Sequence, residues 1–262
     1  MTVTHASDVP SEKPGKTGAA NEFVEIVKTI LWALGIALVL RVLLFQPFTI
    51  PSASMEPALF EGDYIIVSKF TYGYSRHSIP FSPPVFNGRV LERSPRRGDV
   101  VVFKLPRDDR TDYIKRLVGL PGDRIQVKGG ALSINGQQLD REQLTPDTET
   151  SPYGPSLEVP RVRETFPDGK TVTTYDRYEN GEVDNTDVYV VPAGHYLMMG
   201  DNRDNSVDSR YPEAIGVGMV PAENLVGKAE LILLSWTPEA SLFKPWTWVT
   251  ELRPSRFFTR LR

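Results

Sequence analysis

A long apolar run near the amino terminus limits what this chain can fold into more than any other feature. Between Thr29 and Phe45 the only charged residue is Arg41. As a helix this run is about 25 Å long, close to the minimum for crossing a bilayer. Arg41 lies near the end of the run, so its long side chain can reach the interface and avoid a cost of about 2.5–3.5 kcal/mol at the bilayer centre. We therefore predict a transmembrane helix over residues 29–46.

Two other interpretations of the run are a buried core helix and a cleaved signal peptide. The run is apolar on every face and follows a polar tail, which is unusual for a helix that packs against a core. It is also long for the apolar part of a signal peptide, although the small triplet Ser52-Ala53-Ser54 loosely fits a cleavage site. Both points favour the transmembrane helix.

The charges that flank the run predict its orientation. Residues 1–22 are rich in Ser, Thr, Gly, Lys and Glu, so we expect residues 1–28 to form a disordered tail. Lysines precede the run, whereas Lys69 is the only basic residue in the segment 51–70. Because basic flanks stay in the cytoplasm, we predict a single-pass protein of the cytoplasmic (inner) membrane, with a cytoplasmic amino terminus and residues 47–262 outside.

The composition excludes several kinds of site. The chain has no cysteine, so it has no disulfide, thiolate metal site or cysteine nucleophile. Its net charge of −3 and its dispersed Lys and Arg residues give no basic patch for nucleic acid. The three histidines, His5, His77 and His195, fall in a tail, a loop and a strand, so we expect no metal site and no cofactor.

After the apolar run, short stretches rich in β-branched and aromatic residues alternate with turn signals such as Asn135-Gly136. No long helical pattern interrupts them, so we predict a mainly β fold built on an antiparallel β-sheet. Residues 71–97 are typical of a long loop, and residues 137–186, with weak strand signals, are predicted to form a smaller inserted β lobe. The predicted strands cover residues 64–67, 100–103, 113–118, 125–127, 132–134, 188–191, 196–199 and 229–234.

Two segments carry residue types suited to nucleophilic catalysis. The first, residues 48–57, follows the apolar run directly and places Ser52 and Ser54 between two prolines. A serine hydroxyl is a poor nucleophile unless a base removes its proton. The second, residues 112–123, is typical of a strand in which Lys115 shares a face with apolar neighbours. Burial would lower the pKa of this lysine from its reference of about 10.4 and allow it to act as a base, although a strand lysine is usually a surface residue.

A third segment, residues 200–210, is a polar loop rich in Asp and Asn. A solvated turn and a calcium site are its ordinary interpretations. The spacing does not match the twelve-residue calcium loop, because the glycine at its sixth position and the glutamate at its twelfth are missing. His195 precedes the loop and could complete a Ser–His–Asp set, but we favour a local hydrogen bond at the start of a strand.

Together these segments resemble the type I signal peptidase (leader peptidase) family of serine peptidases, which use a Ser–Lys dyad. The resemblance covers roughly residues 29–236 and is weak in residues 71–97 and 137–186. Ala53 and Ala58 stand where glycine and threonine are frequent, and neither change removes a catalytic group. The matching motifs follow an apolar anchor in the family's order, and they are residues 50–57 with 62–63, residues 97–103, residues 113–116 with 119–123, and residues 200–210.

The resemblance implies a role for each motif residue. Ser54 would be the nucleophile, and Lys115 the general base that later protonates the leaving amine. Ser52 would complete an oxyanion hole with the Ser54 backbone N–H, and Ser206 would orient the lysine. The charge pair expected to support the site is Asp208 with Arg210. The residues expected to line the shallow apolar substrate pockets are Ile50, Leu59, Ile65, Tyr113 and Ile114.

The resemblance also implies a function: a membrane-bound serine endopeptidase that removes signal peptides from secreted preproteins after small residues, by an Ala-x-Ala rule. No metal or cofactor would be needed. The partners would be preproteins and the lipid bilayer, with the secretion translocon as a further candidate.

Two alternatives to this function remain. The first is a related Ser–Lys peptidase with a dedicated substrate, such as a processing enzyme of conjugation or a self-cleaving repressor-like domain. A self-cleaving domain usually lacks the membrane span. The second is a non-enzymatic scaffold, which we would expect to have lost Ser54 or Lys115.

The carboxyl-terminal segment is aromatic and ends in basic residues. Core packing and contact with the membrane interface would both use its rings. Its arginines fit interface anchoring and ordinary solvation equally well. The residues concerned are Trp236, Phe243, Trp246, Trp248, Arg256, Phe257, Phe258, Arg260 and Arg262.

Overall fold

The amino-terminal apolar run forms a helix, α1, which spans Lys16–Leu43. The structure, a computed structural model, describes residues 16–149, 157–178, 180–240 and 244–261. Within α1, the 23 residues of Asn21–Leu43 are apolar enough to cross a membrane, and none of the apolar window is buried by protein. They span about 35 Å, more than the hydrocarbon core of about 30 Å. This exposure fits a membrane anchor and argues against a buried core helix.

The helix differs from the predicted one at both ends. It begins at Lys16, so residues 16–28 of the predicted disordered tail are helical, while the first fifteen residues lie outside the described part of the chain. Apolar residues such as Phe23 continue the helical segment on this side. The helix also ends before residue 46, because Phe45–Thr49 forms strand β1. Pro47 cannot continue a helix.

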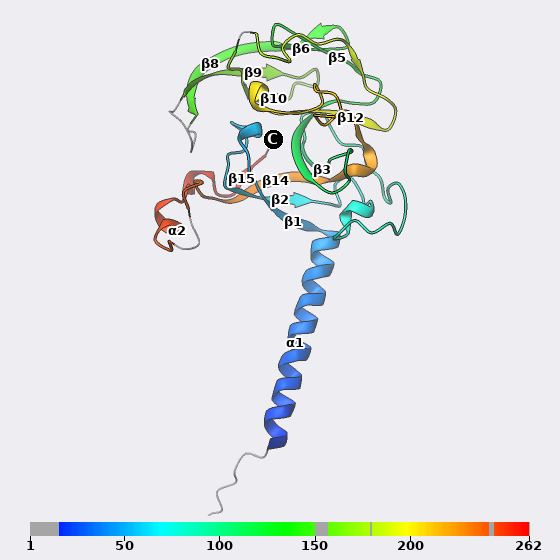
Figure 1. Ribbon diagram of the computed structural model, residues 1–262, viewed down its shortest axis with the longest axis vertical. Helices are drawn as coiled ribbons and strands as arrows, with labels where there is room; N and C mark the ends of the chain where they lie inside the picture. The colour runs from blue at the N-terminus through cyan, green and yellow to red at the C-terminus, as the bar shows by residue number, and fades with distance from the viewer. Residues whose placement is uncertain (1–15, 150–156, 179, 241–243, 262) are drawn as a thin grey trace, which may run out of the picture. The chain divides into compact units, whose positions relative to one another are not determined.

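The chain divides into two units, Met1–Arg41 and Val42–Arg262. An antiparallel sheet of eight strands forms the centre of the second unit (Figure 1), in the order β1-β2-β14-β3-β4-β12-β13, with β15 beside β14. The mainly β prediction is therefore confirmed. Beyond β1, the strands are β2 (Asp63–Ser68), β3 (Val100–Lys104), β4 (Asp112–Gly119), β12 (His195–Met199), β13 (Val220–Pro221), β14 (Leu225–Ser235) and β15 (Thr259–Arg260).

Two smaller sheets complete the unit. One has the order β10-β9-β8, with β8 at Asp140–Glu149, β9 at Leu157–Thr165 and β10 at Thr171–Tyr175. It lies within the predicted inserted lobe, and it packs into the same compact unit as the main sheet. The other has the order β11-β5-β6-β7, with β5 at Arg124–Lys128, β6 at Ala131–Ile134, β7 at Gln137–Gln138 and β11 at Tyr189–Val190.

The centre of the main sheet is buried on both faces. Along β3, Val100 and Val102 belong to one core cluster, whereas Val101 and Phe103 belong to another. Side chains alternate between the two faces of a strand, so a run of consecutive apolar residues is stable only where both faces are covered. Lys115 lies on β4 opposite Val101, and its side chain therefore starts inside the protein.

The remaining elements are short. Residues 71–97 contain the 3₁₀ turn η2 and an isolated bridge between Tyr74 and Val90, in agreement with a long loop. The short helical elements are η1 (Ala53–Met55), η2 (Arg76–Ser78), η3 (Arg203–Asn205), η4 (Ala222–Asn224), α2 (Thr247–Thr250) and η5 (Pro254–Arg256).

The aromatic carboxyl-terminal segment is only partly packed. Trp236 meets the ring of Tyr64 edge to face at 5.3 Å, and its indole N–H donates to the Trp248 carbonyl. Trp246 and Trp248 are exposed, so core packing does not account for them. Phe243 lies outside the described residues.

Candidate active site

Ser54 occupies a rigid turn directly after β1. The turn is η1, closed by a hydrogen bond from the Glu56 N–H to the Ala53 carbonyl. Met55 is completely buried in the core, and the Leu59 N–H donates to its carbonyl. These contacts fix the backbone on both sides of Ser54, whose side chain is left at the boundary of the core with the residue 9% exposed.

The structure brings Lys115 to Ser54. The amine Nζ lies 2.5 Å from the Ser54 Oγ, and Lys115 is only 4% exposed. Burial disfavours the ammonium form and lowers the pKa of Lys115 to about 8, although the carboxylates of Asp208 and Asp201 act in the opposite direction. An amine with this pKa is partly neutral near physiological pH and can accept a proton from the hydroxyl.

Ser52 lies beside the same hydroxyl. Its Oγ is 3.3 Å from the Ser54 Oγ, and the side chain faces solvent. Within the described part of the chain the Ser54 backbone N–H has no acceptor. A side-chain hydroxyl and a backbone N–H are therefore both available next to the nucleophile.

The polar loop 200–210 is built around a buried ion pair. Arg210 donates to both carboxylate oxygens of Asp208, from Nε and Nη2, at 2.9 Å each, and both residues are almost completely buried. Burial alone would raise the pKa of Asp208, but the guanidinium of Arg210 and backbone N–H donors outweigh it and hold this pKa below its usual value. The carboxylate therefore stays ionised close to Lys115.

Ser206 is bonded to the buried ion pair, and its implied role in orienting Lys115 stays a prediction. Its hydroxyl donates to Asp208 Oδ2 at 2.8 Å, and among the described residues no hydrogen bond joins it to Lys115. Ser206 helps to fix the carboxylate of Asp208, which in turn affects the pKa of Lys115.

Two residues that sequence reasoning missed dock this loop onto the nucleophile. The backbone N–H of Asn202 donates to the Ser54 carbonyl at 3.2 Å, and its side-chain amide donates to the Ala53 carbonyl at 3.1 Å. Gly200 lies at the closest approach: a Cβ there would come within 2.3 Å of Ser206 Oγ and 2.5 Å of the Ser54 carbonyl oxygen. The local signal for this contact is the glycine directly after β12.

A second buried ion pair holds the loop on β4. Arg116 donates to Asp201 from Nε at 2.7 Å and from Nη2 at 2.6 Å, and Arg116 Nη1 donates to the Gly98 carbonyl. The side chain of Arg116 thus lies on the face of β4 opposite that of Lys115, as alternation along the strand predicts. The base and the loop that surrounds it are therefore positioned by adjacent residues of one strand.

The implied pocket residues lie in the core around the site. Ile50, Leu59 and Ile65 are buried in one cluster, with Ile114 partly buried beside them. Tyr113 packs against the other core cluster, and its ring centroid lies 5.9 Å from Lys115 Nζ. Their role in binding a substrate stays a prediction.

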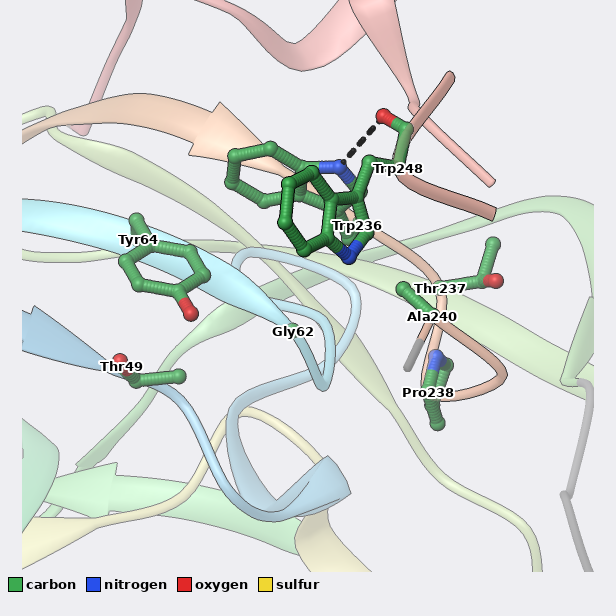
Figure 2. Close-up of a pocket in the computed structure, with 8 residues that line it drawn as sticks. All are labelled: Thr49, Gly62, Tyr64, Trp236, Thr237, Pro238, Ala240 and Trp248. Atoms are coloured by element: carbon green, nitrogen blue, oxygen red, sulfur yellow. Dashed lines mark hydrogen bonds between the residues drawn. The ribbon is translucent and has the colours of Figure 1, made fainter. Parts of the chain in front are cut away.

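The structure holds a separate apolar pocket of about 430 Å³ near the end of β1 (Figure 2). It shares no residue with the Ser54–Lys115 pair. Three of its lining residues are aromatic, namely Tyr64, Trp236 and Trp248, and Figure 2 labels all three. Its lining residues are Thr49, Gly62, Tyr64, Trp236, Thr237, Pro238, Ala240 and Trp248.

Neither of the two histidines in the described part of the chain, His77 and His195, is hydrogen-bonded to Ser54. His195 makes a local contact, with Nδ1 3.0 Å from the Ala193 carbonyl oxygen. His77 Nδ1 lies 2.9 Å from Ser82 Oγ, but the Arg76 Nε–H donates to His77 Nε2. Nε2 is then the acceptor nitrogen, so Nδ1 carries the proton and donates to Ser82. This histidine cannot remove a proton from that serine.

A group of three carboxylates could hold a metal ion by its spacing. The oxygens of Asp176, Asp184 and Asp204 lie within 4.8 Å of one another. Only Asp204 comes from the polar loop 200–210, whose other two aspartates are paired with arginines. The group shares no residue with the Ser54–Lys115 pair.

Comparison with known proteins places the chain in a family. The family model described as "Signal peptidase, peptidase S26" matches residues 23–236. The chain belongs to the signal peptidase family. It is 40% identical to the signal peptidase I of Rickettsia typhi over 247 residues, covering 86% of this chain and 89% of that protein. It is 39% identical to the signal peptidase I of Rickettsia akari over 250 residues, with coverage of 86% and 88%.

A solved signal peptidase I structure from Enterococcus faecalis V583 matches with 26% identity and a TM-score of 0.30, covering 52% of this chain and 97% of that chain. The sequence matches establish that the protein is a serine peptidase of the signal peptidase family, with signal-peptide-bearing preproteins as substrates. The apolar helix α1 fits the single membrane anchor of such an enzyme.

Replacement of Gly200 by alanine should push loop 200–210 away from η1, the turn that carries Ser54. The added methyl would overlap both Ser206 and the Ser54 carbonyl, and a displacement of about 1 Å at a catalytic group can cost about 100-fold in rate. We expect Gly200→Ala to lose about 100-fold in preprotein cleavage while the protein remains folded. Gly35→Ala, in helix α1 with open space around it, should cleave normally; equal activity of the two variants would contradict the docking of the loop.

Proposed function

We propose that the chain cleaves signal peptides with a catalytic dyad formed by Ser54 and Lys115. The observation that carries this proposal is the 2.5 Å contact between the serine hydroxyl and a buried amine. Family membership supplies the reaction, which is hydrolysis of a preprotein by a serine peptidase. The geometry supports the assignment of these two residues to its chemical steps.

In the first step, the neutral Lys115 amine takes the hydroxyl proton while Ser54 Oγ attacks the carbonyl carbon of the scissile bond. The resulting ammonium donates this proton to the leaving amine, and the signal peptide remains as an ester on Ser54. The same amine then activates a water molecule that hydrolyses the ester. One group thus acts as base and acid in turn, in a variant of the logic of the catalytic triad.

The oxyanion of the tetrahedral intermediate needs donors on the other side of the carbonyl. The Ser54 backbone N–H and the Ser52 hydroxyl are placed to provide them, since both lie next to the nucleophile and neither is committed to a strong partner. Loss of one such donor typically costs about 2.7–4 kcal/mol of barrier. Asp208, Arg210 and Ser206 support the site by fixing the electrostatic surroundings of Lys115.

The backbone of the substrate can pair with β4. Residues Asp112–Lys115 are paired with β3 on one side, and β12 joins the other side of β4 only from Arg116 onward. Among the described residues the first half of β4 therefore has a free edge, which ends at the dyad. An extended peptide can add to such an edge as a further strand. The neighbouring side chains are apolar, which suits the small residues of an Ala-x-Ala rule.

The anchor also supports a location. Lysines precede α1, and the segment that follows it has few basic residues, which favours a cytoplasmic amino terminus and an external catalytic domain from about residue 47. We place the enzyme in the cytoplasmic (inner) membrane, with the lipid bilayer as a partner and the secretion translocon as its source of substrate. Reporters fused after residues 20 and 262 should lie on opposite sides of the membrane; both on one side would contradict this topology.

Removal of either dyad residue should abolish cleavage. We expect Ser54→Ala and Lys115→Ala to lose about 10⁴-fold or more in activity, because loss of a nucleophile or its base removes the covalent route. The measurement is cleavage of a preprotein with alanine at positions −1 and −3, and a version with leucine at −1 should resist the intact enzyme. Ser133→Ala and Lys104→Ala are matched controls outside the dyad and should remain active. Substantial activity of either dyad variant would sink the proposal.

The rate should follow the ionisation of Lys115. Because the base must be neutral, kcat/KM should rise with pH up to the lysine pKa of about 8 and level off above it, with a tenfold loss for about each pH unit below. Ser52→Ala should lower the whole profile without moving its midpoint, because it does not change the charge next to the lysine. A profile that is flat from pH 6 to pH 9 would argue against a lysine base.

A further inference from the structure

Three carboxylates meet where the three-stranded sheet β8–β10 adjoins loop 200–210. Asp176 directly follows β10, Asp184 belongs to the segment between β10 and β11, and Asp204 lies on η3. One oxygen from each residue lies within 4.8 Å of the others. Burial raises the pKa of Asp176, and the carboxylates of Asp204 and Asp184 raise it further, against the effect of Arg141. The group is therefore a concentration of negative charge.

The positive charge next to this group does not balance it. Arg141 pairs with Asp176, and Asp184 and Asp204 form no ion pair with another described residue. Asp184 is only 1% exposed, although a carboxylate buried to this degree is normally paired with a cation or bound to a metal. Three carboxylates and one guanidinium leave two negative charges, which one divalent cation would neutralise.

One oxygen of the group is buried without a hydrogen-bond partner. Asp204 Oδ2 accepts from the backbone N–H groups of Arg177 and Tyr178, at 2.6 Å and 3.0 Å. Asp204 Oδ1 is buried as well, and within the described part of the chain no donor reaches it. Nearly all buried polar atoms of folded proteins have a partner, so an orphaned carboxylate oxygen indicates a bound water or ion.

Gly181 keeps the space between two of the carboxylates open. A Cβ at this position would lie 2.3 Å from Asp204 Oδ1 and 3.2 Å from Asp184 Oδ2, so the orphaned oxygen faces the second carboxylate across the glycine. The φ angle of Gly181 lies outside the left-handed region, so its backbone conformation does not require glycine. The missing side chain therefore provides room beside the carboxylate oxygens.

We propose that Asp176, Asp184 and Asp204 bind a calcium ion. Carboxylate oxygens are ligands that Ca²⁺ prefers, at about 2.3–2.6 Å, so two oxygens on one ion lie at most about 5 Å apart. The spacing of the group, within 4.8 Å, fits this limit. Mg²⁺, with ligands at about 2.0–2.1 Å, needs a tighter group. The prediction of no metal site rested on the histidines, and a site made of carboxylates is not covered by it.

The ion would tie loop 200–210 to two segments outside it. Asn202, two residues before Asp204, donates to the Ser54 carbonyl, and the Tyr175 N–H, directly before Asp176, donates to the Asp201 carbonyl. The ion thus adds a link beside an existing one and restrains the backbone that docks on the nucleophile. This site goes beyond the proposed function, because none of its three ligands belongs to the dyad or to the free edge of β4.

Calorimetric titration with CaCl₂ of the full-length chain, freed of metal and held in non-ionic detergent, tests the site. We expect one site with a Kd of about 10⁻⁴–10⁻³ M, and a Tm about 3–5 °C higher at ten times that concentration. Equal MgCl₂ should raise the Tm less. Asp184→Asn and Asp204→Asn should bind at least tenfold more weakly, whereas Asp187→Asn, at an exposed position of the same segment, should bind normally. A Tm that CaCl₂ leaves unchanged, or equal binding by Asp184→Asn and Asp187→Asn, would overturn the proposal.

A second measurement separates an ion site from a purely structural group. Asp184→Asn removes one of three like charges, while its amide oxygen can still accept from the Gly181 N–H that Asp184 binds. In EDTA its Tm should therefore equal or exceed that of the unchanged chain, and CaCl₂ should not raise it. A Tm that is several degrees lower in EDTA and in CaCl₂ alike would contradict the proposal. Binding of Ca²⁺ in a Ser54→Ala background should be unchanged, so this result does not depend on the dyad.

Discussion

The site depends on a buried amine, that of Lys115, whose pKa the protein lowers to about 8. An ammonium group buried as deeply as Lys115 would normally be stabilised by a carboxylate in direct contact. Two carboxylates, Asp208 and Asp201, are near enough to act on its pKa, but each accepts a two-point hydrogen bond from an arginine. Arg210, which pairs with Asp208, also lowers the pKa of the lysine directly. The amine is thereby left with the Ser54 hydroxyl as its partner.

Several parts of the structure hold loop 200–210, which carries both Asp201 and Asp208, in a fixed position. Arg203 on η3 pairs with Glu164 of β9, both nearly inaccessible to solvent, and the Tyr175 N–H of β10 donates to the carbonyl of Asp201. Removing one partner of a buried ion pair typically costs about 3–5 kcal/mol, because the other charge is left uncompensated. The inserted sheet β8–β10 thus supports loop 200–210 and, through Asn202, the backbone of Ser54.

Local patterns in the sequence anticipate the parts of this site that depend on one element. The alternation of side chains along residues 113–117 predicts a lysine that points inward and an arginine that points the other way, and the structure agrees. The apolar run predicts an anchor, but its bounds are shifted because strand β1 begins at Phe45 and residues 16–28 are helical. Periodicity describes the middle of an element better than its ends.

The details missed by the sequence depend on how loop 200–210 folds back on itself and on how it packs against η1. Ser206 turns to Asp208 rather than to the lysine because the loop folds back on its own ion pair. Gly200 and Asn202 matter because η1 packs against this loop, and no local pattern encodes that approach. Of the residues assigned to substrate pockets, Ile50, Leu59 and Ile65 belong to one core cluster and Tyr113 packs against another, and their role in binding a substrate stays a prediction.

The short path from helix to nucleophile sets a limit on where the chemistry can occur. Strand β1 advances the chain by about 17 Å, and η1 with Ser54 follows it after three further residues. Because β1 is also an edge strand of the main sheet, the nucleophile stays within a few tens of ångströms of Leu43. A peptide bond far from the lipid could not reach Ser54 without unfolding this connection. With α1 in the membrane as proposed, the substrate must present its cleavage site close to the lipid, which is where a signal peptide ends when its apolar part is still inserted.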